Sequence, residues 1–206
     1  MIKTICATLL LLAIQPAVGE DFRPHVRIQN TVSKSTRLFS GTICDSTESQ
    51  YLVVTCAHGF ADLSKDKRKL VVELFSEDGG VVENAEILKE DIDKDIAILA
   101  IKKRDYVVVR PIPIASDAKL SEGTECLSYG YTPEYTKRIM TVTSYSKYAG
   151  TNGDGLLLCN GHIEAGMSGG ALIYQGHIFG VLSTSTKHPG GLYATASHII
   201  EVRDRK

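Results

Sequence analysis

Short apolar runs, separated by polar or glycine-containing turns, dominate the pattern of the chain from about residue 50 onward. The runs are rich in β-branched and aromatic residues, which favour strands over helices. The clearest lie at residues 52–55, 70–74, 96–101, 125–129, 156–159, 171–174 and 177–182. Roughly a dozen short strands predict sandwiches or barrels, in which closure removes exposed sheet edges.

Two prolines interrupt this pattern within residues 110–114. Proline has no backbone donor, so this stretch cannot be a central strand and is better read as a connector. We therefore predict an N-terminal β unit over residues 20–110 and a C-terminal β unit over residues 111–206. Only residues 197–203 have a pattern compatible with a helix.

The N-terminal segment differs from the rest of the chain. Lys3 precedes an almost wholly apolar run over residues 4–14, Pro16 follows it, and small residues lead to Gly19. This is the layout of a secretory signal peptide, and the run is too short to span a bilayer comfortably. We expect residues 1–19 to be removed and the mature protein to be secreted or periplasmic.

The composition limits the classes of binding partner that we expect. Apolar residues make up 43% of the chain and charged residues 23%, which are ordinary globular values. The 23 basic and 24 acidic side chains nearly balance, so no nucleic-acid surface is predicted. We expect no membrane partner once the signal peptide is cleaved, and the sequence leaves the oligomeric state open.

The cysteines suggest two disulfides. Cys6 leaves with the predicted signal peptide, so the five cysteines become four. An even number in an exported chain permits two disulfides in three connectivities. We favour Cys44–Cys56, because a turn between them would bring adjacent strands together, and this leaves Cys126–Cys159. Four buried free thiols are the alternative.

Three segments carry the residue types of nucleophilic catalysis. One strand leads into His58, Asp95 opens a buried strand, and Ser168 lies in the glycine-rich segment 166–170. Each signal alone is weak, because a packed histidine, a turn aspartate and a tight turn look the same. Together they complement one another. A serine needs a base to take its proton, an imidazole titrates near neutrality, and a carboxylate orients that imidazole.

The glycines of this segment also allow an oxyanion-binding site. They let the backbone turn so that the amides of Gly166 and Ser168 face one point, where they can stabilise an oxyanion. With His58 as the general base, we expect activity to rise with pH through an apparent pKa of roughly 6–7.

Other readings of these motifs fit less well. The segment around Ser168 also matches the nucleophile elbow of α/β-hydrolases, in which the acid and then the histidine follow the serine. No Asp or Glu lies between Ser168 and His198, so that order is unavailable. A calcium loop starting at Asp91 would need glycine where Ile96 stands, and no zinc-ligand spacing accompanies His58. We expect no metal and no other cofactor.

The chain resembles the chymotrypsin-fold (trypsin-like) serine proteases over essentially its whole mature length. Thr55-Cys56-Ala57-His58, residues 95–99 and residues 166–170 look like the histidine, aspartate and nucleophile motifs of that family, in its chain order. Bacterial Deg/HtrA-type proteases look closest, judging by residues 113–115 and 123–131, here without a peptide-binding module.

That resemblance implies an all-β fold of two six-stranded Greek-key β-barrels, with the active site in the cleft between them. The N-terminal barrel would carry His58 and Asp95, and the C-terminal barrel would carry Ser168 and a short helix. It also implies a secreted serine endopeptidase that acts on protein or peptide substrates. A secreted protease-like binding protein that has lost catalysis is the alternative.

The chain departs from the family at two positions. Digestive members carry an aspartate before the nucleophile, which pairs with a new N-terminus on activation, and Met167 stands here instead. We therefore expect no such activation step. The usual cysteine after the histidine is replaced by Gly59, so the family disulfide at that position cannot be carried over.

The resemblance also assigns a substrate-binding set. Ser183, Thr184 and Ser185 would form the strand that hydrogen-bonds the substrate backbone, while His162 would lie at the base of the specificity pocket, which would be lined by Gly191 and Tyr193. His162 would either attract an acidic substrate side chain when protonated, or hydrogen-bond Tyr193 and shorten the pocket in favour of small apolar side chains.

Overall fold

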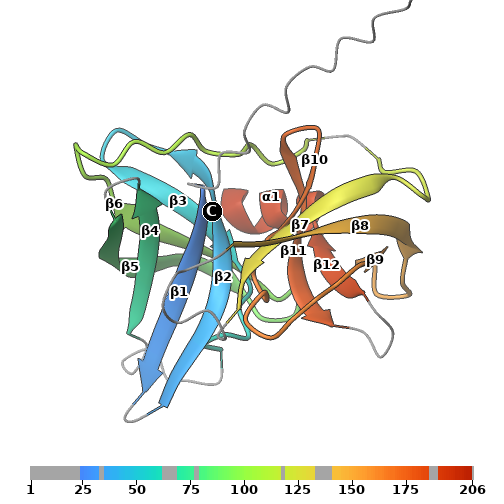
Figure 1. Ribbon diagram of the computed structural model, residues 1–206, viewed down its shortest axis with the longest axis horizontal. Coiled ribbons are helices and arrows are strands. Elements are labelled where there is room, and N and C mark those ends of the chain that lie inside the picture. The colour runs from blue at the N-terminus through green and yellow to red at the C-terminus, as the bar shows by residue number, and fades with distance from the viewer. Residues whose placement is uncertain are drawn as a thin grey trace, which may run out of the picture.

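The computed structural model describes residues 24–32, 35–61, 69–76, 79–116, 119–132, 141–185 and 190–205. The described strands form two closed barrels of six antiparallel strands each, which lie side by side (Figure 1). The predicted all-β fold of two six-stranded barrels is confirmed. The predicted signal peptide, residues 1–19, lies outside the described residues.

Each barrel contains six strands that are consecutive along the chain, although their order around the barrel is not the chain order. The first barrel, blue to green in Figure 1, contains β1 (His25–Val32), β2 (Ser35–Ser46), β3 (Gln50–Thr55), β4 (Leu70–Ser76), β5 (Gly79–Asp91) and β6 (Ile96–Lys102). The second barrel, yellow to red, contains β7 (Glu125–Tyr131), β8 (Thr141–Thr151), β9 (Leu157–Asn160), β10 (Ala171–Tyr174), β11 (His177–Ser185) and β12 (Gly191–Thr195). The segment with the two prolines joins the barrels, and Ile114 alone forms a parallel bridge, to Ile178.

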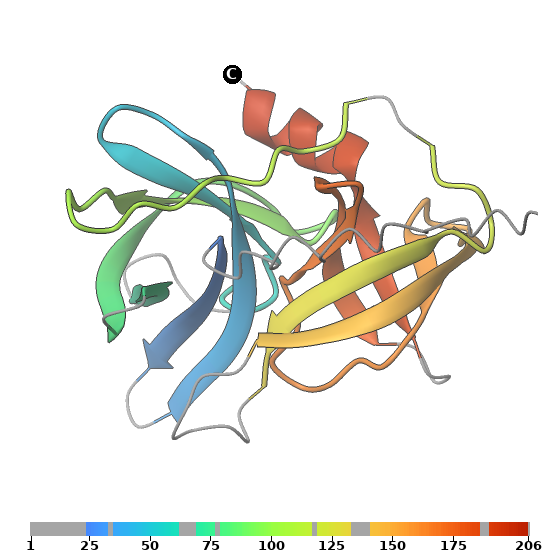
Figure 2. The same ribbon diagram turned by 45° about the horizontal axis from the view of Figure 1, so that its top comes forward.

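A helix closes the described chain. In α1 (Ala196–Asp204), the hydroxyl of the N-cap residue Thr195 accepts a hydrogen bond from the His198 amide at 3.3 Å. Ile199 and Val202 are buried in a cluster shared by both barrels, and the helix lies between them (Figure 2). Within the described ranges, no helix is long and apolar enough to cross a membrane.

Strand β6 explains how the first barrel positions the site. Its first six residues are buried because its two faces belong to different cores. Leu99 and Ile101 point into the first barrel, whereas Ile96 and Ile98 pack in the cluster between the barrels. A strand covered on both faces reads as a continuous apolar run, and Asp95 stands directly before it.

Candidate active site

His58 and Asp95 meet because their strands are neighbours. Thr55 at the end of β3 pairs with Ala97 near the start of β6, so the residues just beyond this pair lie close together. His58 Nδ1 donates to Asp95 Oδ2 at 2.7 Å, and the His58 backbone amide donates to Asp95 Oδ1, also at 2.7 Å. The carboxylate thus fixes both the backbone and the imidazole of His58.

Asp95 itself is held in an uncommon conformation. Its φ of 53° lies in the left-handed region, and its amide donates to the Ile92 carbonyl at 3.2 Å to close the turn before β6. The Ser183 hydroxyl donates to Asp95 Oδ2 at 2.6 Å. Ser183 was expected only in the substrate-binding strand, so its contact with the acid is a role that the sequence did not indicate.

Two contacts stabilise the charged form of His58. The hydrogen bond with Asp95 is the larger influence, and Cys56 Sγ adds a second, at 3.7 Å from His58 Nε2. They outweigh partial burial and raise the pKa of His58 from 6.5 to about 10. This is higher than the 6–7 expected from the sequence, because that expectation took the imidazole without its neighbours.

Ser168 lies on the turn between β9 and β10, and backbone hydrogen bonds hold this turn on both sides. The Gly169 amide donates to the Leu182 carbonyl of β11 at 2.8 Å, and the Gly170 amide donates to the Met167 carbonyl at 2.8 Å. The Ser168 carbonyl accepts from the Ser40 amide of β2 at 2.7 Å. The turn therefore contacts both barrels.

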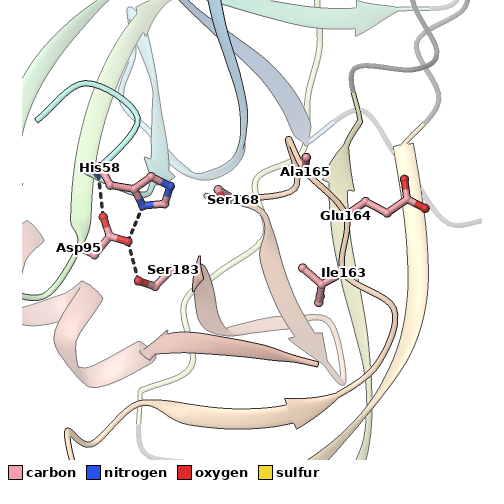
Figure 3. Close-up of a pocket in the computed structure, with 7 residues that line it drawn as sticks. All are labelled: His58, Asp95, Ile163, Glu164, Ala165, Ser168 and Ser183. Carbon is pink, nitrogen blue, oxygen red and sulfur yellow. Dashed lines mark hydrogen bonds and ion pairs between the residues drawn. The ribbon is translucent and has the colours of Figure 1, made fainter. Parts of the chain in front are cut away.

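A pocket of about 490 Å³ brings the three candidate catalytic residues together. Figure 3 shows Ser168 across from the His58 ring, with its hydroxyl on the side of the imidazole. The pocket is lined by His58, Asp95, Ile163, Glu164, Ala165, Ser168 and Ser183. Residues that lie far apart in the sequence thus share one cavity, and the first barrel supplies two of them while the second supplies the rest.

The backbone amides of the turn fall into two groups. Those of Met167, Gly169 and Gly170 donate to backbone carbonyls. For the amides of Gly166 and Ser168, no acceptor is found among the residues that the structure describes. Gly166 has a φ of 92°, which glycine adopts at little cost.

Met167 is fully buried, in the core of the second barrel. A Cβ at Gly130 of β7 would lie only 2.7 Å from the Met167 Cα, so the two backbones are in close contact. The position where digestive relatives carry an aspartate therefore holds an apolar side chain in an apolar environment.

The substrate-binding residues expected from the resemblance are dispersed. The His162 side chain is 67% exposed and pairs with Glu164, so it lies at the surface. Tyr193 is buried, and its hydroxyl lies 2.6 Å from the Ser128 hydroxyl. Each residue thus has a different partner from the one suggested. It is Ile163, the residue after His162, that lines the pocket.

The remaining residues of that set lie at the paired ends of β11 and β12. Thr184 pairs with Leu192, and Ser185 pairs with Gly191. A Cβ at Gly191 would lie 3.3 Å from Ile163 Cγ1, so the Gly191 backbone and the Ile163 side chain pack together.

The two expected disulfides are wrong, because Cys44, Cys56, Cys126 and Cys159 are all free and buried. In the first barrel, Cys56 lies just beyond the pair that Thr55 forms with Gly41, and Cys44 lies three residues further along β2. At about 3.3 Å per residue, this offset exceeds the ~7 Å between Cα atoms that a disulfide tolerates.

In the second barrel, a strand separates the other two thiols. Cys126 pairs with Ser146, and Cys159 pairs with Tyr148, so β8 runs between them. Strands lie about 4.8 Å apart, which places residues on either side of a middle strand too far apart for a disulfide. Burial raises the pKa of Cys126 to about 11 and that of Cys159 to about 12.

Comparisons with known proteins agree with this fold. A family model described as a trypsin-like peptidase domain matches residues 39–181. A comparison with curated proteins gives no match. Among solved structures, the serine endoprotease from Yersinia pestis has a TM-score of 0.72 and 21% sequence identity, over 89% of this chain and 62% of that one.

Two further structures are similar at comparable levels. Deg5 has a TM-score of 0.69 and 19% identity, over 87% of this chain and 86% of that one. The active form of the Rv3671c protease from M. tuberculosis has a TM-score of 0.69 and 18% identity, over 87% and 79%. These likenesses support the fold, and the family model covers more than half of the chain. The protein therefore belongs to the family of trypsin-like peptidase domains.

Proposed function

We propose that this protein is an exported serine endopeptidase that cleaves peptide bonds through an acyl-enzyme at Ser168. The observation that carries the proposal is the shared pocket, in which Ser168 faces a histidine already bound to a carboxylate. His58 is the general base, Asp95 orients it, and the amides of Gly166 and Ser168 form the oxyanion hole.

The reaction follows from these positions. Ser168 Oγ attacks the substrate carbonyl carbon while His58 Nε2 takes its proton, and the carbonyl oxygen becomes an oxyanion. The two amides without a described acceptor, those of Gly166 and Ser168, donate to that oxygen. His58 then protonates the leaving amine, and a water molecule hydrolyses the ester by the same route in reverse.

The alternative is a secreted binding protein that keeps the protease fold but is catalytically silent. Such a protein has no need for a histidine hydrogen-bonded through both its ring and its backbone to an acid. The proposal is favoured because all three catalytic side chains are present and line one pocket.

Labelling with a fluorophosphonate tests the proposal directly. We expect the mature protein to be labelled once per chain, in a reaction that speeds up as pH rises, and the variant Ser168→Ala to remain folded and unlabelled. Intact mass spectrometry measures the adduct, and it also shows whether an exported sample lacks residues 1–19. A folded wild-type protein that never acquires the adduct, even at alkaline pH, would favour the binding protein.

A further inference from the structure

Ser40 lies on β2 of the first barrel. This strand contacts β7 of the second barrel where the two barrels meet (Figure 1). It is almost fully buried, with 1% of its surface exposed. Its hydroxyl donates to the Gly166 carbonyl at 2.7 Å and accepts from the Tyr131 amide at 2.8 Å. One buried hydroxyl therefore joins β7 to the loop that carries the nucleophile.

The backbone of Ser40 contacts the same loop a second time. Its amide donates to the Ser168 carbonyl at 2.7 Å, and its own carbonyl accepts from Thr55 Oγ1 at 2.6 Å. Gly166 and Ser168 are the two residues whose amides are the proposed oxyanion donors. Ser40 thus holds the carbonyl of each donor residue, and Met167 is the only residue between them.

These contacts constrain a segment that would otherwise rotate easily. Gly166 has a φ of 92°, and glycine exchanges between backbone conformations at low cost. If the peptide after Gly166 turned over, its carbonyl and the Ser40 hydroxyl would both lose a partner in a buried environment, which is unfavourable. The hydroxyl therefore stabilises one orientation of the turn.

We propose that Ser40 is a positioning residue for the oxyanion hole: by holding the Gly166 carbonyl, its hydroxyl keeps the Gly166 and Ser168 amides directed into the pocket. Ser40 touches neither substrate nor the reacting atoms. This inference rests on the proposed function, because it assigns a support to the same site. The residue belongs to the barrel opposite Ser168, so the docking of the two barrels and the geometry of the hole are linked.

The test compares three variants of the mature protein. Ser40→Ala removes the hydroxyl, and Ser40→Cys keeps nearly the same shape with a weaker donor. Thr42→Val is the matched control, because Thr42 is also a buried residue of β2 and its hydroxyl contacts His25 rather than the nucleophile loop. The probes are the rate of fluorophosphonate labelling and the hydrolysis of p-nitrophenyl acetate, which needs no specificity pocket.

We expect Ser40→Ala to lower kcat and the labelling rate by about 10- to 100-fold, less than the ~10²–10³ that loss of one oxyanion donor costs, because the donors are displaced and not removed. KM should change little, and the acid limb of the pH profile should stay in place, because His58 and Asp95 are untouched. Ser40→Cys should give an intermediate loss, and Thr42→Val should keep the wild-type rate.

Two results would overturn this role for Ser40. One is a folded Ser40→Ala or Ser40→Cys that is labelled within about twofold of the wild-type rate. The other is a loss of the same size in Thr42→Val, which would indicate a general effect of buried hydroxyls in β2. Ser40→Cys decides the matter even if Ser40→Ala does not fold, because its shape is close to that of serine. A wild-type protein that is never labelled would instead count against the proposed function.

Discussion

The two barrels hold their shares of the candidate site by different means. In the first, a side chain positions the histidine: Asp95 accepts from the ring and the backbone of His58. The Ser183 hydroxyl, from the second barrel, donates to the same carboxylate. In the second, backbone positions backbone: amides of the turn around Ser168 donate to carbonyls of β11 and of the turn itself. The first arrangement determines where a proton is held, and the second determines where amide groups point.

This difference predicts two kinds of failure. A change in the first barrel should alter protonation of the imidazole while the backbone stays in place. A change in the turn around Ser168 should displace that turn and leave the titration of His58 unchanged. Ser40 connects the two, because it lies in the first barrel and acts on the backbone of the second.

Replacing Asp95 with Asn should have the largest effect on turnover. The neutral amide of Asn is a weaker hydrogen-bond acceptor for the ring N–H than a carboxylate. The imidazole therefore loses its fixed orientation, and its protonated form loses the negative charge that stabilises it. We expect kcat to fall by about 10⁴, with the thermal unfolding midpoint nearly unchanged, as measured by steady-state hydrolysis and calorimetry.

Asp93→Asn is the control, because Asp93 lies two residues earlier in the same turn and is exposed. It should keep wild-type turnover. If Asp95→Asn were as active as the wild type while Asp93→Asn was impaired, the orienting role would belong to Asp93, and the side-chain network of the first barrel would have no catalytic part.

Replacing Gly169 with Ala should disrupt the turn around Ser168, which the second barrel contributes to the site. A Cβ at this position would lie 2.2 Å from the Ser40 carbonyl oxygen and 2.3 Å from Thr55 Oγ1, and the φ of 83° already disfavours a side chain. Overpacking and left-handed backbone together should cost about 2 to 5 kcal/mol of unfolding free energy. The displaced turn should also slow fluorophosphonate labelling by at least about 10-fold.

Gly176→Ala separates the two causes of that loss. Gly176 has a φ of 73°, but nothing lies within 4 Å of its Cβ position. It should therefore lose only the backbone contribution of about 1–2 kcal/mol and label at the wild-type rate. Denaturant unfolding monitors both variants. Equal losses in the two would mean that the close approach of Gly169 to β2 contributes nothing.

Local patterns predicted the buried strands and the order of the chemistry. The runs that form β3, β6 and β10 are apolar because most of their residues are buried, in β6 on both faces. Strands such as β5 were missed because one face is solvated, and its buried Glu83 pairs with the distant Arg104. A charged residue within a strand weakens the apolar pattern that identifies strands from sequence.

Such local patterns could not predict the contacts between distant segments. Ser40 and Gly166 are brought together only when the second barrel docks against β2. The expected Cys44–Cys56 pair failed for a related reason, because the register of the β2–β3 hairpin and its bulge set the positions of both residues. Register and docking depend on all the strands of a barrel at once, so neither is contained in a short stretch of sequence.

The smallest expected effect is a shift of the pH profile on removing the Cys56 thiol. The imidazole can accept a proton from Ser168 only when Nε2 is unprotonated, so activity should be low below the pKa of His58 and rise as pH passes through it. Because that pKa is raised to about 10, the wild-type protein should still be gaining activity above neutral pH. Cys56 Sγ lies 3.7 Å from Nε2 and is the second of the two contacts that raise this pKa.

Cys56→Ala should therefore move the acid limb of kcat/KM to lower pH and increase relative activity near pH 7. Cys44→Ala is the control, because it removes a buried thiol from a different hydrophobic cluster, and it should leave the limb in place. The limb is measured from p-nitrophenyl acetate hydrolysis across the pH range. An unchanged limb in Cys56→Ala would leave Asp95 alone in control of the base, and an equal shift in both variants would point to a change in the barrel rather than to contact with the imidazole.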